Sequence, residues 1–229
     1  MPPRADWLHK ARSLVGRTLQ AGDTVSEPYE SSPSHAAFAA ELLSRVEITR
    51  EQWRTPGPER VRMAADALAA TQKAQQDNAV ALHRIVESLR QWPGRRTVGQ
   101  NACQAAVSIA VHCDHDPAFQ QRLLRLLQVA VTAGEATRAQ LAHLHDRCLV
   151  NARQPQLYGT QHWYRTDGQL QPHPIADLAQ LDTRRAGADL PPYAEQARHL
   201  RERHGPLGSL STTATADPIP FSLPERCAA

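Results

Sequence analysis

Apolar residues recur along most of the chain at the spacing that places them on one face of an α-helix. The clearest run is Leu82, Ile85, Val86 and Leu89, which follows the i, i+3, i+4, i+7 rule. The periodicity predicts seven helices. The first begins at residue 35, the second runs from about residue 58 to 76, and the others lie around residues 82–89, 102–111, 119–130, 141–148 and 192–204.

Polar residues and proline mark where several of these helices begin. Ser34 can cap the helix that starts at the next residue, since its hydroxyl can accept a hydrogen bond from a free backbone N–H. Asp116 followed by Pro117 is typical of a helix start. Asp77 and Asn78 interrupt the apolar pattern, and we interpret them as the cap of a new helix.

From residue 156 the pattern changes to aromatic and β-forming residues, followed by Asp167-Gly168, which favours a tight primed turn. A strand here would place Tyr158 and Thr160 on one face and the residues between them on the other. The chain is therefore predicted to be mainly α, with about seven helices in an orthogonal bundle and one small β-hairpin near residues 156–172.

The segments outside the periodic region suggest three parts. Residues 1–33 hold a short helical stretch and a proline-containing polar segment, which we interpret as an N-terminal arm or linker. Residues 34–204 form a single helical domain. Residues 205–229 are rich in Pro, Ser and Thr without periodicity, so we expect a flexible C-terminal tail.

Composition narrows the classes of partner. Lys and Arg number 26 against 23 Asp and Glu, a net charge of +3, and the arginines are scattered rather than clustered, so no nucleic-acid partner is expected. No window approaches 18 consecutive apolar residues, so no membrane partner is expected. The charged N-terminal residues do not resemble a signal peptide, and we expect a cytoplasmic protein.

The four cysteines also fit a reducing compartment. They form no CxxC pair and lie mostly in apolar helical segments, where burial raises a thiol pKa and lowers its reactivity. The chain has no Gly-rich phosphate loop, no GxSxG elbow and no HExxH motif. We therefore expect no cofactor of the familiar nucleotide or redox types.

The most polar string of the helical region is 112–117. His112 and Asp114 are candidates for an acid–base or orienting pair, because a nearby carboxylate tunes an imidazole that titrates near neutral pH. The alternative is a histidine bonded to a backbone carbonyl at a helix end. Residues two apart on a helix point about 200° away from each other, so neither this string nor His143 and His145 converges well on a metal ion, and we expect no metal.

Other polar residues are candidates for holding a substrate. Arg147, next to Asp146, has a planar fork that fits a carboxylate or phosphate, although a structural ion pair fits as well. Tyr158 and Gln161 can line a wall that faces a substrate, or can belong to a bulge where the hairpin docks on the helices. Trp92 either lines a pocket or simply packs near the end of its helix.

Several of these strings occur in an order that resembles a known family. The strings are Asp77-Asn78, Trp92-Pro93, Val98-Gly99, the 112–117 string with Gln120, Asp146-Arg147, the 156–161 segment with Tyr-Gly-Thr-Gln, and Asp182 with Arg184-Arg185. Over residues 60–200 they resemble an uncharacterised family of mainly helical bacterial domains with a Tyr-Gly-Thr-Gln signature. The chain departs from the family pattern at Val111, where Gln is usual, and after the arginine pair, which is typical of a diverged member.

The resemblance implies an architecture rather than a reaction, so the function is a hypothesis built on the residues. We expect a cofactor-independent enzyme that acts on a small polar or anionic molecule by acid–base chemistry, in bacterial specialised metabolism. The alternative is a non-catalytic ligand-binding or protein-interaction module. The expected catalytic residues are His112, Asp114 and Tyr158. The expected substrate-binding residues are Asp146, Arg147, Gln161, Arg185 and Trp92. Five of them, His112, Asp146, Arg147, Tyr158 and Gln161, are predicted to meet around one cavity.

Overall fold

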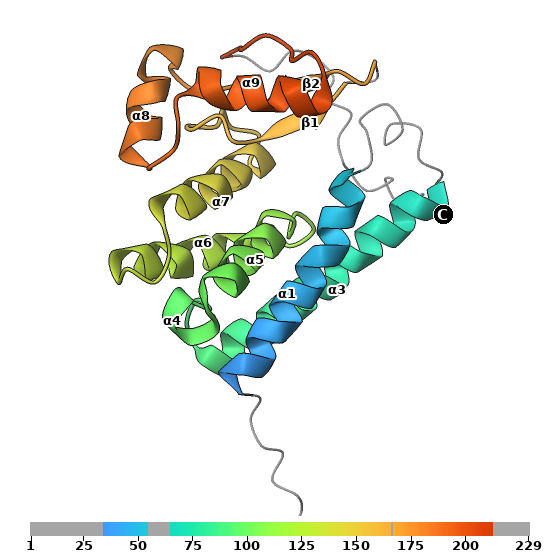
Figure 1. Cartoon of the computed structure of the whole chain (residues 1–229), viewed down its shortest axis with the longest axis vertical. Coiled ribbons are helices and arrows are strands. Elements are labelled where there is room, and N and C mark those ends of the chain that lie inside the picture. The colour runs from blue at the N-terminus through green and yellow to red at the C-terminus, as the bar shows by residue number, and fades with distance from the viewer. Residues whose placement is uncertain (1–33, 55–64, 166, 213–229) are drawn as a thin grey trace, which may run out of the picture. The chain divides into compact units, whose positions relative to one another are not determined.

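The computed structural model of the chain describes residues 34–54, 65–165 and 167–212, and these residues are mainly helical (Figure 1). The helices are α1 (His35–Arg54), α3 (Ala65–Leu89), α4 (Arg95–Val98), α5 (Gln100–Val111), α6 (Pro117–Thr132), α7 (Arg138–Asn151), α8 (Leu181–Gly187) and α9 (Tyr193–His204). The strands β1 (His162–Tyr164) and β2 (Leu170–Pro172) form a two-stranded antiparallel sheet. The predicted fold class, mainly α with one small hairpin, is confirmed.

The N-terminal arm, the start of the helix expected near residue 58 and most of the predicted C-terminal tail lie outside the described residues. The described residues include no helix that is long and apolar enough to cross a membrane.

Two of the predicted helix starts, at Ser34 and at Asp116-Pro117, are confirmed. The backbone N–H of Ala37 donates to the Ser34 hydroxyl at 3.3 Å. The Asp116 carboxylate accepts from the N–H of Phe119 at 2.9 Å, and Pro117 occupies the first position of α6. These bonds satisfy N–H groups that have no partner inside the helix.

The predicted break at Asp77-Asn78 is wrong, because α3 continues through both residues without interruption. Asn78 is buried, and the Arg45 guanidinium on α1 donates to its side-chain oxygen at 3.4 Å. The same Arg45 nitrogen donates to the Asp77 carbonyl at 3.3 Å. Asn costs a helix only about 0.7 kcal/mol, so packing of Leu82 and its neighbours against α1 outweighs this local preference.

The larger hydrophobic core is built around α5, which packs against α1, α3, α4, α6 and α7. Ala105, Ala106 and Ala110 on α5 are fully buried, and their small side chains let neighbouring helices approach closely. Figure 1 shows α1 and α3 side by side, with α5 next to α1. A second, smaller core contains Ile175 together with Tyr193 of α9.

The hairpin is shorter than predicted. Its register pairs His162 with Pro172 and Tyr164 with Leu170. The turn carries the expected glycine, Gly168, at a φ of +81°. Residues 157–161 are not part of a strand but form a bent loop, so the predicted alternation of side chains along this segment is wrong.

The segment after α9 differs from the predicted flexible tail. The N–H of Gly208 donates to the Leu170 carbonyl at 2.8 Å, and the N–H of Ile175 donates to the Ser211 carbonyl at 2.8 Å. The Gln171 side chain donates to the Ser209 carbonyl at 2.7 Å. Residues 205–211 are thus docked beside β2, and the remainder of the predicted tail, residues 213–229, lies outside the described residues.

Candidate functional site

The Asp146 carboxylate on α7 organises the loop that precedes β1. Its side chain is fully buried, and it accepts from the backbone N–H of Leu157 at 2.8 Å, of Tyr158 at 3.1 Å and of Thr160 at 3.0 Å. It also accepts from the Thr160 hydroxyl at 2.9 Å. These donors compensate a buried negative charge in the way that backbone N–H groups hold an anion. The carboxylate is therefore engaged by the loop.

Two arginines hold the carbonyl groups of the same loop. Arg185 is fully buried, and it donates to the carbonyls of Tyr158 and Pro191 and to the Gln196 side-chain oxygen at 2.6 Å. Its guanidinium carbon lies 5.7 Å from the centre of the Tyr193 ring, a cation–π geometry.

The neighbouring Arg184 donates to the Leu157 carbonyl at 2.8 Å and to the Asp177 carbonyl at 2.9 Å. The arginine pair of the resemblance thus fastens the loop to the segments that flank it. The predicted role of Arg185 in holding an anionic ligand stays a prediction, although its guanidinium already has three partners.

Two glutamines complete the loop. The Gln156 side chain is fully buried, accepts from the N–H of Gln161 at 2.8 Å and donates to the carbonyls of Gln161 and His173 at 3.0 and 2.9 Å. The Gln161 amide donates to the His143 carbonyl at 3.2 Å and to the Thr160 hydroxyl at 3.0 Å. Side chains thus satisfy the backbone of a loop that belongs to no sheet, which gives this Tyr-Gly-Thr-Gln segment a structural explanation.

Gly159 is required by the same loop. Its φ is +67°, a left-handed conformation that favours glycine. A Cβ atom added there would lie 3.1 Å from both Ile175 and the Tyr193 ring. The smaller core thus approaches the backbone closely at Gly159.

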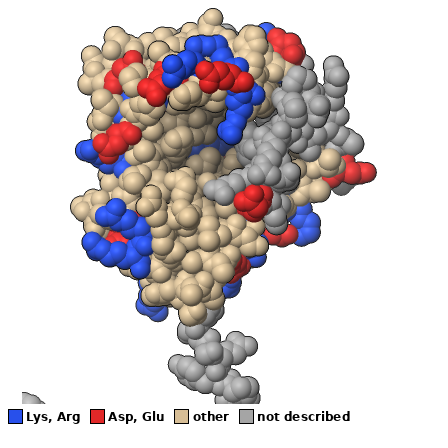
Figure 2. All heavy atoms as spheres, viewed as in Figure 1, with Lys and Arg blue, Asp and Glu red and all other residues tan. Residues whose placement is uncertain are grey.

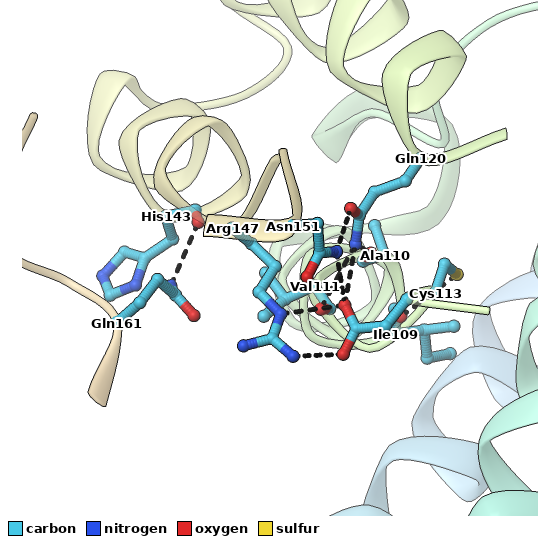
Figure 3. Close-up of polar contacts among 10 residues, drawn as sticks. Ile109, Ala110, Val111, Cys113, Gln120, His143, Arg147, Asn151 and Gln161 are labelled. Carbon is cyan, nitrogen blue, oxygen red and sulfur yellow. Dashed lines mark hydrogen bonds and ion pairs between the residues drawn. The ribbon is translucent and has the colours of Figure 1, made fainter. Parts of the chain in front are cut away.

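Asp114 and Arg147 form a second polar cluster, between α7 and the connection from α5 to α6 (Figure 3). The Arg147 Nε donates to Asp114 at 2.8 Å, and its Nη2 makes a second bond to the other carboxylate oxygen. The Asn151 amide donates to Asp114 at 2.7 Å and to the Gln120 side-chain oxygen at 2.8 Å. Gln120 in turn donates to the Ala110 carbonyl at 3.0 Å, which ties the end of α5 to α7.

This arrangement fixes the charge state of Asp114. Burial pushes its pKa up, but the hydrogen bonds and charge of Arg147, with the Asn151 amide, outweigh burial and hold the pKa below its ordinary value. His112, at the C-terminal end of α5, is half-buried and its charge acts in the same direction. The acid–base role predicted for His112 and Asp114 stays a prediction. Arg147 already bonds both oxygens of the Asp114 carboxylate.

A cavity lies elsewhere among the described residues, between α7, the 156–161 loop and α9, and its volume is about 570 Å³. Figure 2 shows this face of the molecule hollowed next to a row of charged side chains where Figure 1 places α9. The cavity is lined by His143, Thr160, His162, Leu190, Pro191, Gln196, His199, Leu200 and Arg203. None of the predicted site residues is among them, although Asp146, Gln161 and Arg185 directly contact residues that are.

Burial keeps two histidines of this cavity neutral. It lowers the pKa of His162 to about 4, and a backbone hydrogen bond with Thr160 opposes only part of that effect. Burial also lowers the pKa of His143, with the charge of Asp146 opposing and that of Arg185 adding to the effect. At neutral pH both imidazoles therefore carry one N–H donor and one nitrogen acceptor. The Tyr193 hydroxyl lies 3.5 Å from the Nε2 of His162.

Trp92 is buried in the larger core and also lines a smaller cavity of about 150 Å³, beside α4 and α6. Its indole Nε1 has no hydrogen-bond partner in the part of the chain that the structure describes. This cavity is remote in sequence from the loop and α9, and the predicted role of Trp92 in binding a substrate stays a prediction.

Three of the four cysteines are described, and all three are free and buried, as expected. Burial raises the pKa of the Cys103 and Cys113 thiols, and raises that of Cys148 to about 11. Within residues 34–54, 65–165 and 167–212, no three His, Cys, Asp or Glu side chains are grouped to hold a metal ion.

Sequence reasoning missed most of the cavity wall, although one signal was present. Gln196, His199, Leu200 and Arg203 follow the i, i+3, i+4, i+7 spacing and so share one face of α9. This face is mostly polar, and a search for apolar periodicity passes over it. His162 was placed in a strand without a role, and only the structure shows that it points to the same space as His143.

We compared the chain with known protein families, curated proteins and solved structures. No curated protein and no solved structure matches the chain. Residues 35–207, which make up most of the chain, match a family of unknown function, DUF6624. This range contains all of the strings on which the resemblance was based, together with the residues that line the larger cavity. The chain belongs to this family of unknown function.

Proposed function

We propose that the chain binds a small polar molecule in the 570 Å³ cavity and acts on it by acid–base chemistry through His143 and His162. The volume lies within the range of roughly 300–1,000 Å³ that is typical of small-molecule sites. Polar side chains converge there with an apolar patch, which is the usual composition of such a site.

The observation that carries the proposal is the pair of neutral imidazoles on the cavity wall. The His143 ring holds one nitrogen that can accept a proton from a ligand and one N–H that can polarise a carbonyl or hydroxyl oxygen. The His162 ring already bonds with the Thr160 backbone and lies 3.5 Å from the Tyr193 hydroxyl, so a ligand reaches its Nε2 by taking the place of that hydroxyl. Neither ring is used as a cap, and the fastened loop holds His162 in place next to Thr160. The chemistry is assigned to these residues rather than to His112 and Asp114, because Arg147 occupies the Asp114 carboxylate.

A second candidate is a ligand-binding protein that does not turn its ligand over. Among the described residues, no carboxylate lines the cavity or hydrogen-bonds the ring of His143 or His162, although a carboxylate commonly orients a histidine that acts as a general base. The two candidates share the cavity and differ only in whether the bound molecule reacts.

A mixed library of neutral, cationic and anionic small molecules tests the proposal, with binding followed by ligand-observed NMR. Leu200→Trp fills the cavity, and Leu43→Trp makes the same change on the exposed surface of α1. We expect compounds whose binding is lost in Leu200→Trp and retained in Leu43→Trp. If no compound of any charge distinguishes the two variants, the cavity is not a binding site.

The two candidates are then separated with the same compounds. Incubation with wild-type protein and with His162→Gln is followed by NMR of the compound itself. Slow conversion by the wild type alone supports the enzyme, because a neutral amide cannot accept the proton. Binding by both proteins without conversion supports the non-catalytic candidate.

A further inference from the structure

We infer that the cavity takes a small organic anion with an apolar part, and that the guanidinium of Arg203 holds the anionic group. This inference rests on the proposed function only in using the same cavity. It adds the charge of the ligand and the residue that selects it.

The first support comes from the hydrogen bonds of the cavity lining, because several of its polar groups already have partners inside the protein. The Thr160 hydroxyl donates to Asp146 and accepts from Gln161, so it is already used. The Gln196 side-chain oxygen accepts from Arg185 at 2.6 Å, and its amide nitrogen lies 3.3 Å from the Gly159 carbonyl. The His162 ring is engaged by the Thr160 backbone and the Tyr193 hydroxyl, and one nitrogen of His199 lies 3.4 Å from Arg198. Among the described lining residues, the His143 ring and the Arg203 guanidinium therefore have the most hydrogen bonds left to offer a ligand.

The second support is charge. Among the residues that the structure describes, no carboxylate lines the cavity, and Arg203 makes no hydrogen bond or ion pair. Behind the wall, the charge of the buried Arg185 acts on His162 without an opposing carboxylate, whereas at His143 the charge of Asp146 outweighs that of Arg185. A negative ligand is therefore favoured on the side of the cavity formed by His162 and Arg203, away from His143.

The third support is the apolar side of the same space. Leu190, Pro191 and Leu200 line the cavity together with the polar groups. An inorganic ion would leave these side chains facing water, whereas an organic anion would cover them. Carboxylates and phosphates share this chemistry, since a guanidinium binds both through its planar fork.

Four probes with one phenyl ring test the inference: benzoate, phenyl phosphate, benzamide and benzylammonium. Each is titrated into the full chain, and affinity is measured from the shifts of backbone amide signals in NMR spectra. Benzoate and benzamide have nearly the same shape, so their difference reports charge. We expect benzoate or phenyl phosphate to bind about tenfold or more tightly than benzamide, since a charge-assisted bond is stronger by about that factor. The tighter of the two identifies the anionic group.

Arg203→Gln is the decisive variant, and Arg201→Gln is its matched control. Both remove one arginine from α9, but Arg201 does not line the cavity. Arg203 is exposed, so its replacement is not expected to disturb folding, which a melting curve checks. We expect Arg203→Gln to weaken anion binding by about tenfold and Arg201→Gln to weaken it by less than about twofold.

Several results would overturn the inference. One is benzamide or benzylammonium binding as tightly as both anions. Another is an equal loss of anion binding in the two arginine variants. A third is no binding of either anion at millimolar concentration. The inference fails and the proposed function stands if Leu200→Trp abolishes the binding of neutral compounds while the anions do not bind in the cavity.

Discussion

Replacing Asp146 with Asn tests whether one buried carboxylate holds the loop that forms the cavity wall. Five contacts of 2.8–3.2 Å reach its two oxygens from Leu157, Tyr158 and Thr160. Asn keeps the shape but turns one oxygen into an amide nitrogen, which cannot accept. If that nitrogen replaces Oδ1, it faces the N–H of Leu157. If it replaces Oδ2, it faces both donors of Thr160.

The structure sets the size of the expected loss. A buried donor that loses its acceptor costs about 1–3 kcal/mol, and each remaining bond weakens by about 1 kcal/mol when its acceptor becomes neutral. With one donor orphaned and two or three bonds weakened, Asp146→Asn should lower the free energy of unfolding by about 3–6 kcal/mol. This is a large part of the roughly 5–15 kcal/mol by which a domain is stable.

Asp182→Asn is the control. Its exposed carboxylate accepts one bond, from the N–H of Tyr193 at 2.7 Å, and Asn can still accept it. We expect this variant to lose less than about 1 kcal/mol. Urea unfolding followed by circular dichroism measures both. A loss below about 1 kcal/mol in Asp146→Asn, or an equal loss in both variants, would refute the view that Asp146 holds the loop.

Three further predictions concern the same region. Gly159→Ala should destabilise the protein by about 1–3 kcal/mol, because φ is positive and the new Cβ meets the smaller core. The control, Gly187→Ala in α8, has free space around the new Cβ and should leave stability unchanged. Equal urea midpoints for the two variants would contradict this. A chain that ends at His204 should melt at a lower temperature than a chain that ends at Thr212, because the shorter chain lacks the hydrogen bonds that residues 205–211 make beside β2. Identical melting temperatures would show that these bonds do not stabilise the fold. The free energy of unfolding should fall as the pH drops from about 6.5 to about 4. In this range His162 takes up a proton in the unfolded chain but not in the folded protein, where its pKa is about 4, and this difference contributes up to about 3 kcal/mol. His162→Gln should flatten that slope, and an unchanged slope would contradict the assignment.

Local signals were sufficient for most of the helices. Ser34 and Asp116 cap helices as their positions indicate, and the alanines of α5 are buried as its apolar run predicts. The exception is Asp77-Asn78, where the local preference for a cap loses to Arg45, which lies 32 residues away in sequence. A sequence pattern does not show a partner at that distance.

The candidate site was harder to predict, because the residue types that suggest chemistry also build loops. Asp146, Arg185 and Gln161 were selected as residues that bind a substrate, and the structure shows each of them hydrogen-bonded inside the protein. Asp146 and Arg185 bond backbone groups of the 156–161 loop, and Gln161 in that loop bonds the His143 carbonyl of α7, pairings that no periodicity reveals. The cavity depends on where α9 lies against α7, and this placement follows from the smaller core around Ile175.

A crystal structure of the protein soaked with benzoate or phenyl phosphate shows directly whether the cavity binds an organic anion. We expect a molecule in the cavity, with its anionic group within hydrogen-bond distance of Arg203 and its ring against Leu200, between His143 and His162. Clear density for that molecule beside Asp114 and Arg147 instead, or an empty cavity at a concentration that saturates binding in solution, would contradict it.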